Sequence, residues 1–345
     1  MNDHAAPTPA GSAPADDAAL ADALAADYAT LRAEIGKRVV AQEQAVELTL
    51  LTLLAGGNSL LVGVPGLAKT LLVHTVADAL ALTFSRIQFT PDLMPSDITG
   101  SDLVQEDPDT GRRHFQFAPG PVFANIVLAD EINRTPPKTQ AALLEAMQER
   151  KVTVQGKTYP LDPPFFVFAT RNPIELEGTY SLPEAQLDRF LFEIQLDYLP
   201  EDAELDVVRA TTSETQASIE PVITGEQLLA YQGLVRRVPL ADDVGRHALA
   251  LVRATRPGGD TTPDFVERWL AYGASVRAAQ TLVLAGKARA LVHGRAHVAF
   301  EDVRALAHPV LRHRILRNFH AEAERVNTDQ IVDRLLEAIP VPQSP

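Results

Sequence analysis

The sequence predicts an α/β domain that is followed by an all-helical domain. Three observations support this prediction. Residues 59–72 read as a buried strand, a glycine-containing turn and a helix that begins at Lys69. Further apolar runs of strand length follow as far as Leu196, and their continuity is typical of a parallel sheet covered on both faces. After Pro200 these runs stop, and apolar residues recur at helical spacing.

Composition describes an ordinary globular protein with an acidic balance. The chain has 345 residues, which is long enough for two domains with separate cores. Hydrophobic residues make up 46% and charged residues 22%, as is typical of globular proteins. The formal net charge of −14 argues against general binding to nucleic acid, which depends on Lys and Arg. The absence of cysteine excludes disulfides and fits a reducing compartment.

The two ends of the chain are predicted to be tails. Residues 1–18 are rich in Ala, Pro and Asp without an apolar period, so we expect disorder there, and 331–345 are predicted to be a C-terminal tail. The N-terminus has neither a basic region nor an apolar stretch of the kind that forms a secretory signal. No apolar run approaches the ~20 residues that span a bilayer. We therefore expect a cytoplasmic protein.

Two helices, over 20–36 and 45–55, are predicted before the first strand. The segment between them contains Val40 and Gln42 and reads either as a plain turn or as a cover for the adenine face of a nucleotide. We favour the second interpretation, because the segment closely precedes the candidate phosphate loop.

The turn at 63–70 is a candidate phosphate-binding loop. In such a loop the backbone N–H groups and the helix N-terminus hold phosphate, the lysine reaches the β- and γ-phosphates, and the hydroxyl binds Mg²⁺. Lys69 and Thr70 occupy those positions, whereas Ala68 stands where the usual pattern has glycine, so Ala68 must tolerate the backbone angles of the loop. A chance Gly/Pro turn is the alternative. The residues predicted to bind nucleotide are Gly63, Val64, Pro65, Gly66, Leu67, Ala68, Lys69, Thr70, Leu71, Val40 and Gln42.

Two acidic residues follow the apolar run 125–129, where a phosphate-loop enzyme needs them. Asp130 would hold Mg²⁺ beside Thr70, directly or through water. Glu131 would polarise the attacking water. The alternative is an exposed acidic pair at a strand end, which we disfavour because a phosphate loop precedes it.

The next two predicted strands, 165–170 and 190–196, each lie beside a candidate polar residue. Asn172 follows the first strand and could bind both the γ-phosphate and the attacking water, or could simply form a turn before Pro173. Arg189 precedes the second strand and could be a surface ion-pair residue or the cation that a neighbouring subunit supplies to the transition state.

Hairpins and helices account for most of the remaining chain. Segments 102–117 and 152–159 are predicted to be hairpins, the stretch 90–100 a loop, and 135–150 a helix. Arg277, at a helix start or bend, is a weak candidate for contact with phosphate. The arginines and histidines of 304–320 read as a solvated helix face. Helices are further predicted over 202–210, 224–235, 241–253, 264–286 and 300–314.

With these residues in view, the chain resembles the MoxR-type AAA+ ATPases over residues 19–317. The resemblance is carried by the candidate phosphate loop and by 86–100, 129–134, 143–150, 169–173 and 182–190. Ala68 is itself a form found in the family. Arg171 departs from the family pattern, in which a neutral residue is expected, and Val276 stands where proline is common. Arg171 and Arg134 are possible additional members of the site.

The resemblance implies an αβα core, 19–199, whose parallel five-stranded sheet has the order 5-1-4-3-2, followed by an all-helical lid, 200–330. It implies a hexameric ring with ATP at each subunit junction, between core and lid. It casts Lys69 and Thr70 as Walker A, Asp130 and Glu131 as Walker B, and Asn172 as sensor 1. Arg189 would be the arginine finger and Arg277 sensor 2. The two hairpins would be inserts that face a client or partner.

The function implied by the resemblance is ATP-driven, chaperone-like remodelling or metal-cofactor maturation of client proteins, with a von Willebrand factor A domain protein as partner. Catalytic roles fall to Glu131, Lys69, Asn172, Arg189 and Arg277. ATP and Mg²⁺ are the expected cofactors, and Thr70 and Asp130 the metal ligands. Two alternatives remain open: an ATP-gated assembly protein with little turnover, and the motor of a tetrapyrrole metal chelatase.

Overall fold

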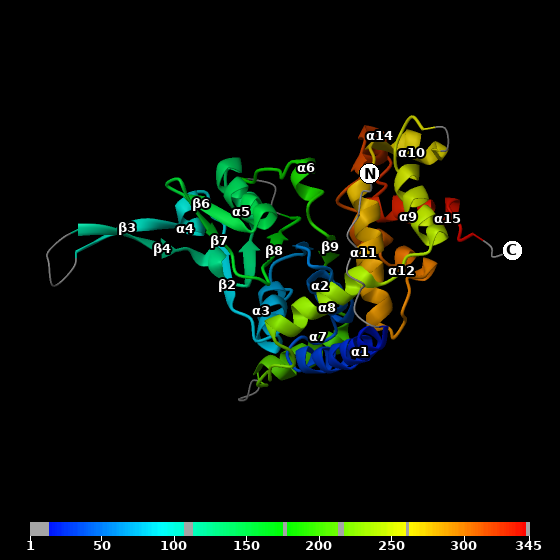
Figure 1. Cartoon of the computed structure of the whole chain (residues 1–345). Coiled ribbons are helices and arrows are strands. Elements are labelled where there is room, and N and C mark those ends of the chain that lie inside the picture. Colours follow the sequence, from blue (N-terminus) through cyan, green and yellow to red (C-terminus); the bar gives the residue numbers. More distant parts are fainter. Residues whose placement is uncertain (1–13, 107–112, 175–177, 213–216, 260–261, 343–345) are drawn as a thin grey trace, which may run out of the picture.

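A five-stranded sheet forms the centre of the first part of the chain in the computed structural model, which describes residues 14–106, 113–174, 178–212, 217–259 and 262–342 (Figure 1). All its neighbouring strands pair in parallel, in the order β2-β5-β8-β1-β9. Numbered along the chain and read from β9, this is 5-1-4-3-2, so the predicted order is confirmed. The strands are β1 (Ser59–Val62), β2 (Phe84–Gln88), β5 (Ile126–Asp130), β8 (Phe166–Arg171) and β9 (Phe192–Gln195).

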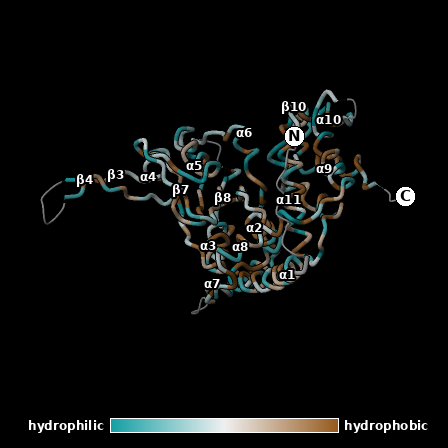
Figure 2. The backbone as a smooth tube through the Cα atoms, viewed as in Figure 1, coloured by the Kyte–Doolittle hydropathy of each residue, from teal (hydrophilic) through white to brown (hydrophobic). Residues whose placement is uncertain are grey.

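Helices cover both faces of this sheet, which is why its strands read as continuous apolar runs. Successive strand residues alternate between two apolar clusters; Leu61 and Phe168 face one, whereas Leu60 and Val167 face the other. The first cluster is closed by α1 (Pro14–Gly36), α2 (Glu43–Ala55) and α3 (Lys69–Ala79), and the second by α4 (Pro95–Thr99) and α5 (Pro137–Glu149). Figure 2 shows hydrophobic segments gathered near α1, α3 and α8.

Both predicted hairpins form, as β3 (Gly100–Glu106) with β4 (Arg113–Pro119), and β6 (Lys151–Val154) with β7 (Lys157–Pro160). The first projects far from the sheet (Figure 1), and the predicted turn at its tip, 107–112, lies outside the described residues. The rings of Phe117 and Tyr159 stack at 4.0 Å and so join the two hairpins. Short 3₁₀ segments follow β4 and β5, at η1 (Pro121–Phe123) and η2 (Ile132–Arg134).

The second part of the chain is almost entirely helical, and much of it lies beside β9 (Figure 1). Helix α8 packs on α1 and α2 as well as on α11, so the predicted domain limits of 19–199 and 200–330 stay a prediction. The helices of this part are α7 (Glu201–Thr212), α8 (Gly225–Arg237), α9 (Asp242–Ala254), α10 (Asp264–Trp269), α11 (Val276–Val292), α12 (Phe300–Ala305), α13 (Ala307–Leu311), α14 (Phe319–Ala323) and α15 (Thr328–Ala338).

The prediction of tails was wrong at both ends where the structure describes them; residues 1–13 and 343–345 lie outside it. Helix α1 already begins at Pro14, with Asp16 and Asp17 in its first turn, where acidic side chains are stabilising. Helix α15 has a capping box at Asn327, and its apolar stripe of Ile331, Val332 and Leu335 is fully buried. The helical spacing of these apolar residues and the capping box are both helix signals in the sequence, and the prediction of a tail overlooked them.

Three predictions of local structure also need correction. The helix expected over 264–286 is interrupted, because β10 (Leu270–Tyr272) pairs with β11 (Leu316–Arg317), and a Cβ at Gly273 would meet the Thr255 carbonyl at 2.3 Å. The helix expected over 300–314 divides into α12 and α13, in keeping with Pro309, which lacks the N–H that a continuous helix would use. The loop expected over 90–100 contains α4. Among the described residues, no helix combines the length and apolarity needed to cross a membrane.

Candidate functional site

The candidate phosphate loop connects β1 to α3 at the carboxyl end of the sheet. Gly63 is required by close packing, because a Cβ there would meet the Leu196 carbonyl at 2.6 Å. Gly66 has φ +90° and opens onto free space. Ala68 adopts left-handed angles, φ 56° and ψ 22°, directly before the helix. The substitution of alanine for the usual glycine therefore keeps the glycine-like conformation, at a cost of about 1 kcal/mol.

Lys69 is held inside this loop. Its Nζ donates to the carbonyls of Gly63 at 2.7 Å and Val64 at 2.8 Å. Burial lowers the pKa of Lys69, and the nearby charges of Asp130 and Glu131 oppose that shift. Both carbonyls belong to the loop itself, so the ammonium lies within the concave side of the candidate phosphate loop.

The other residues predicted to bind nucleotide surround the loop. Gln42 donates from Nε2 to the Leu67 carbonyl at 3.3 Å, and Val40 beside it is half-buried. Thr70 and Leu71 lie in the first turn of α3, Thr70 half-buried and Leu71 36% exposed. The structure therefore brings the segment between α1 and α2 onto the phosphate loop. The exposed part of the loop is formed by Pro65 and Gly66.

Asp130, the last residue of β5, is 9% exposed and has two kinds of partner. Its Oδ1 accepts the Thr170 hydroxyl at 2.6 Å. Its Oδ2 accepts Nε of Arg86 at 3.0 Å and Nη2 of Arg86 at 2.5 Å. Sequence reasoning assigned no role to Thr170 or Arg86. The signal that could have revealed them is their place on strands β8 and β2, the two neighbours of β5.

Glu131 has the backbone of a strained residue, with φ 56° and ψ 49°. Its N–H donates to the Thr170 hydroxyl at 2.8 Å, which fixes the turn after β5. Its Oε2 accepts Gln88 Nε2 at 3.0 Å and Arg134 Nη1 at 2.9 Å. Strain of this kind persists only where surrounding contacts impose it, and it is common at functional sites. Arg134 thus touches a candidate catalytic carboxylate.

Asn172 follows β8, at the same edge of the sheet, and is only 7% exposed. Its Oδ1 accepts the Ile174 N–H at 3.1 Å, as in a turn, so the turn interpretation and a place in the site are compatible. Arg171 turns instead toward Glu193, at 3.5 Å. The charge that departs from the family pattern is therefore paired with β9.

Arg189 and Arg277 lie elsewhere. Both line a hollow of about 380 Å³ together with Asn58 and Leu191, which precede β1 and β9. The hollow is thus at the amino ends of these strands, whereas the phosphate loop follows the carboxyl end of β1. Four residues of strand separate the two ends by about 13 Å. The structure does not bring Arg277 to the phosphate loop of its own chain; it brings Arg277 to Arg189.

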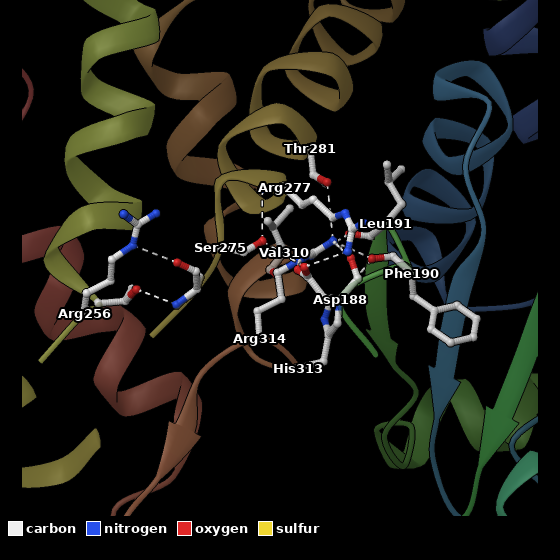
Figure 3. A network of polar contacts seen from close by, with 12 residues as sticks. Asp188, Phe190, Leu191, Arg256, Ser275, Arg277, Thr281, Val310, His313 and Arg314 are labelled. Carbon is white, nitrogen blue, oxygen red and sulfur yellow. Dashed lines mark hydrogen bonds and ion pairs between the residues drawn. The ribbon is translucent and has the colours of Figure 1, made fainter. Parts of the chain in front are cut away.

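A buried arginine organises this second region (Figure 3). Arg314 donates to the carboxylate of Asp188 at 3.0 Å and to the carbonyls of Phe190, Leu191 and Val310. Burial lowers the pKa of Arg314 to about 10. The other oxygen of Asp188 accepts the Ser275 hydroxyl at 2.8 Å and faces Arg277 at 3.4 Å.

The prediction of a solvated basic face over 304–320 was wrong for its central residues. Arg314 and His313 are each 8% exposed, and the side chain of Arg312 is 10% exposed. Sequence reasoning failed here because these three residues lie in a turn after α13, not on the helix predicted over 300–314. Beside this region, Arg189 is exposed, and its guanidinium has no hydrogen bond or ion pair with any described residue.

Metal binding by side chains alone finds no support in the described part of the chain, where no three His, Cys, Asp or Glu residues cluster suitably. A cation at the predicted position would need phosphate oxygens in addition to Thr70 and Asp130.

Comparison with known proteins agrees with this geometry. Residues 58–192 match the ATPase family associated with various cellular activities (AAA), and residues 265–335 match the AAA lid domain. The chain is 43% identical to chaperone MoxR1 of Mycobacterium tuberculosis, over 94% of this chain and 85% of that protein. It is 34% identical to protein MoxR of Paracoccus denitrificans, over 88% and 93%.

A solved structure shares the whole fold. This protein of Cytophaga hutchinsonii, assigned as an ATPase, has a TM-score of 0.88 and 39% identity, covering 95% of this chain and 99% of that one.

Proposed function

Because the chain belongs to the MoxR family of AAA+ ATPases, we propose that it hydrolyses ATP in a ring of identical subunits and uses the resulting motion to remodel a client protein. The observation that supports this proposal most is the separation of two half-sites. The phosphate loop and the carboxylates lie at one end of the sheet, and Arg189 lies at the other, without a partner among the described residues.

The phosphate half-site would be built from the loop and α3. Lys69 exchanges the carbonyls of Gly63 and Val64 for phosphate oxygens, and Gln42 and Val40 cover the base. The oxygen donors Thr70 and Asp130 suit Mg²⁺, a hard cation. The influence of Asp130 on the pKa of Lys69 supports their closeness, and Asp130 Oδ1 keeps a lone pair after accepting Thr170. Mg²⁺ bound there would neutralise phosphate charge.

Hydrolysis would use the two residues that follow β5 and β8. Glu131 accepts a proton from water or orients it for in-line attack, and its left-handed backbone places it in the turn directly after β5. Asn172 holds the water and the γ-phosphate through its amide. Gln88 and Arg134 position the Glu131 carboxylate from two sides.

The arginine half-site would act on the nucleotide of a neighbouring subunit. Arg189 supplies positive charge in the transition state, and Arg277 reaches the same nucleotide from the lid because it shares the hollow with Arg189. In this proposal ATP lies at the junction of two subunits, as the family resemblance implies, and the neighbouring subunit supplies Arg189 and Arg277. A hexamer is the ring size proposed from the family.

The hairpins are the proposed contact with other proteins. Val104 and Phe115 lie opposite each other on β3 and β4 and are 58% and 69% exposed. A client protein would bind there, and a von Willebrand factor A domain protein in the cytoplasm is the proposed partner. Maturation of a metal cofactor in the client is the narrower form of this proposal.

Replacement of Glu131 by Gln tests the hydrolytic role. The amide keeps the size and the hydrogen bond from Arg134 but cannot accept a proton, so phosphate release should fall by about 10²–10⁴. Binding of a fluorescent ATP analogue should stay within about twofold of wild type. Unchanged phosphate release would contradict the assignment of Glu131.

The same variant separates a motor from an ATP-gated assembly protein. A motor loses client remodelling when hydrolysis stops, whereas an assembly protein locked with ATP keeps or gains client binding without turnover. Capture of the client and partner with the Glu131→Gln variant in ATP, compared with capture by wild type in ADP, measures the difference.

A further inference from the structure

The ion pair between Arg86 and Asp130 joins a basic residue to the carboxylate proposed as a magnesium ligand. Both Nε and Nη2 of Arg86 donate to Oδ2 of Asp130, at 3.0 and 2.5 Å. Arg86 lies on β2 and Asp130 on the adjacent β5, so the sheet itself sets their separation. This inference rests on the proposed ATPase function, because that function places Mg²⁺ at Asp130.

The acceptor positions of Asp130 are largely used. A carboxylate offers about four lone-pair positions. Arg86 takes two on Oδ2, and the Thr170 hydroxyl takes one on Oδ1. A cation that binds Asp130 while Arg86 remains would also lie within a few ångströms of the guanidinium. Two cations at that distance repel strongly where water is partly excluded.

Around Asp130, cationic side chains outnumber carboxylates by one. Two carboxylates, Asp130 and Glu131, face three cations: Lys69, Arg86 and Arg134. Lys69 bonds the loop carbonyls and Arg134 bonds Glu131, so among the described residues Arg86 is the cation bonded to Asp130. Arg86 therefore compensates the negative charge of Asp130, as a bound Mg²⁺ would.

We propose that Arg86 is a resident counter-cation that Mg²⁺ displaces from Asp130 when nucleotide and metal bind together. The side chain of Arg86 is 47% exposed, so water can solvate it once it leaves. Gln88 offers an alternative acceptor, because its Oε1 already accepts Nη2 of Arg86 at 2.5 Å. Arg86 is a positioning residue in this proposal, since it acts through Asp130.

The proposal predicts how nucleotide affinity depends on Mg²⁺. Wild type keeps part of its affinity for methylanthraniloyl-ADP in EDTA, because Arg86 compensates Asp130. Replacement of Arg86 by Gln removes that compensation and also removes the competitor of Mg²⁺. The ratio of the Kd in EDTA to the Kd in saturating Mg²⁺ should therefore rise at least about tenfold in Arg86→Gln.

Two variants serve as controls. Arg86→Lys keeps the charge and should return the ratio to within about threefold of wild type. Arg237→Gln removes an equally exposed arginine, 45% exposed, that bonds Asp17 through two nitrogens far from the site, and should leave the ratio unchanged. An Arg86→Gln ratio within twofold of wild type overturns the proposal and leaves Arg86 as a structural link between β2 and β5.

Failure of the wider function would look different, since wild type would then bind no methylanthraniloyl-ADP even with Mg²⁺. If Arg86→Gln does not fold, wild type itself supplies the measurement. The Nε–H resonance of Arg86, identified by its absence in Arg86→Lys, should exchange slowly without ligand and with ADP in EDTA, and rapidly with ADP and Mg²⁺. Slow exchange in all three states would overturn the proposal.

Discussion

The two ends of the central sheet handle charge in different ways. At the carboxyl end, Lys69, Asp130 and Glu131 each contact a partner of their own chain. At the amino end, Arg314 and Asp188 are fully engaged, yet Arg189 beside them is exposed and has no partner among the described residues. The charged side chains at the carboxyl end are therefore already positioned by contacts within the chain. At the amino end, Arg189 is exposed next to the buried Arg314 and its partners.

The difference explains how one chain can carry two unlike halves of a site. Charges that must receive phosphate are held by carbonyls and side chains that phosphate and metal can replace. An arginine that binds the nucleotide of a neighbouring chain needs a fixed backbone and no ion-pair partner in its own chain. Arg314 fixes the backbone next to Arg189 by donating to the carbonyls of Phe190 and Leu191.

Replacement of Arg189 by Ala should have the largest effect on ATP hydrolysis. An arginine supplied to a neighbouring phosphoryl group is typically worth ~10³–10⁵ in rate, so phosphate release should fall by at least ~10³ while the Kd for ATP changes little. Arg209→Ala is the matched control, because Arg209 is 69% exposed and its ion pair is with Asp206 on its own helix.

Mixing tests whether Arg189 acts between chains. Subunits with Arg189→Ala retain Glu131, and subunits with Glu131→Gln retain Arg189, so mixed rings should regain a fraction of wild-type phosphate release. Specific activity of wild type should also rise with protein concentration. No recovery on mixing, together with activity independent of concentration, would show that Arg189 does not serve a neighbour.

Replacement of Arg314 by Met should remove the support beneath Arg189. The change removes the donor to Asp188 Oδ1 and to several carbonyls in a buried setting, which typically costs about 3–5 kcal/mol of stability. Urea denaturation measures the loss. Arg268→Met, which breaks an exposed pair with Glu324, should cost less than about 1 kcal/mol. Equal losses in the two variants would contradict the supporting role of Arg314.

Acid should lower the free energy of unfolding through His313. We expect this effect to be smaller than those of the changes at Arg189 and Arg314. Burial holds the pKa of His313 well below its ordinary value, and Arg314, Arg171 and Arg312 lower it further, against the bond to the Phe190 carbonyl. The folded protein then binds fewer protons than the unfolded chain. Stability is complete above the unfolded pKa of about 6.5 and falls below it by at most ~1.4 kcal/mol per pH unit.

His313→Gln tests this contribution because glutamine can still donate to the Phe190 carbonyl but does not titrate. Between about pH 7.5 and 8.5, His313 is neutral in both the folded and the unfolded protein, so the free energies of unfolding of variant and wild type should differ by a constant amount. Below about pH 6.5 the variant should lose less stability than wild type. If urea denaturation showed the same loss of stability with falling pH in both proteins, His313 would be excluded as a source of acid sensitivity.

Sequence by itself determined the sheet, its order through the family resemblance, both hairpins and most helices. The strands and the loop follow from short-range patterns: apolar runs for strands with two covered faces, and Gly63 and Gly66 for the loop. Local patterns of this kind fix backbone conformation, because the residues that cause it are neighbours in the chain. They failed at the break before α11, where the pairing of β10 with the distant β11 decides the outcome.

Only the tertiary structure decided which charges meet. Arg277 lies far along the chain from both Lys69 and Arg189, and nothing in its sequence neighbourhood says which of them it joins. Arg314 is buried because β9 and α11 close over it, and Arg86 reaches Asp130 because β2 pairs with β5. Coulombic interaction depends on distance and on solvent exclusion, and both are properties of the folded arrangement rather than of spacing along the chain.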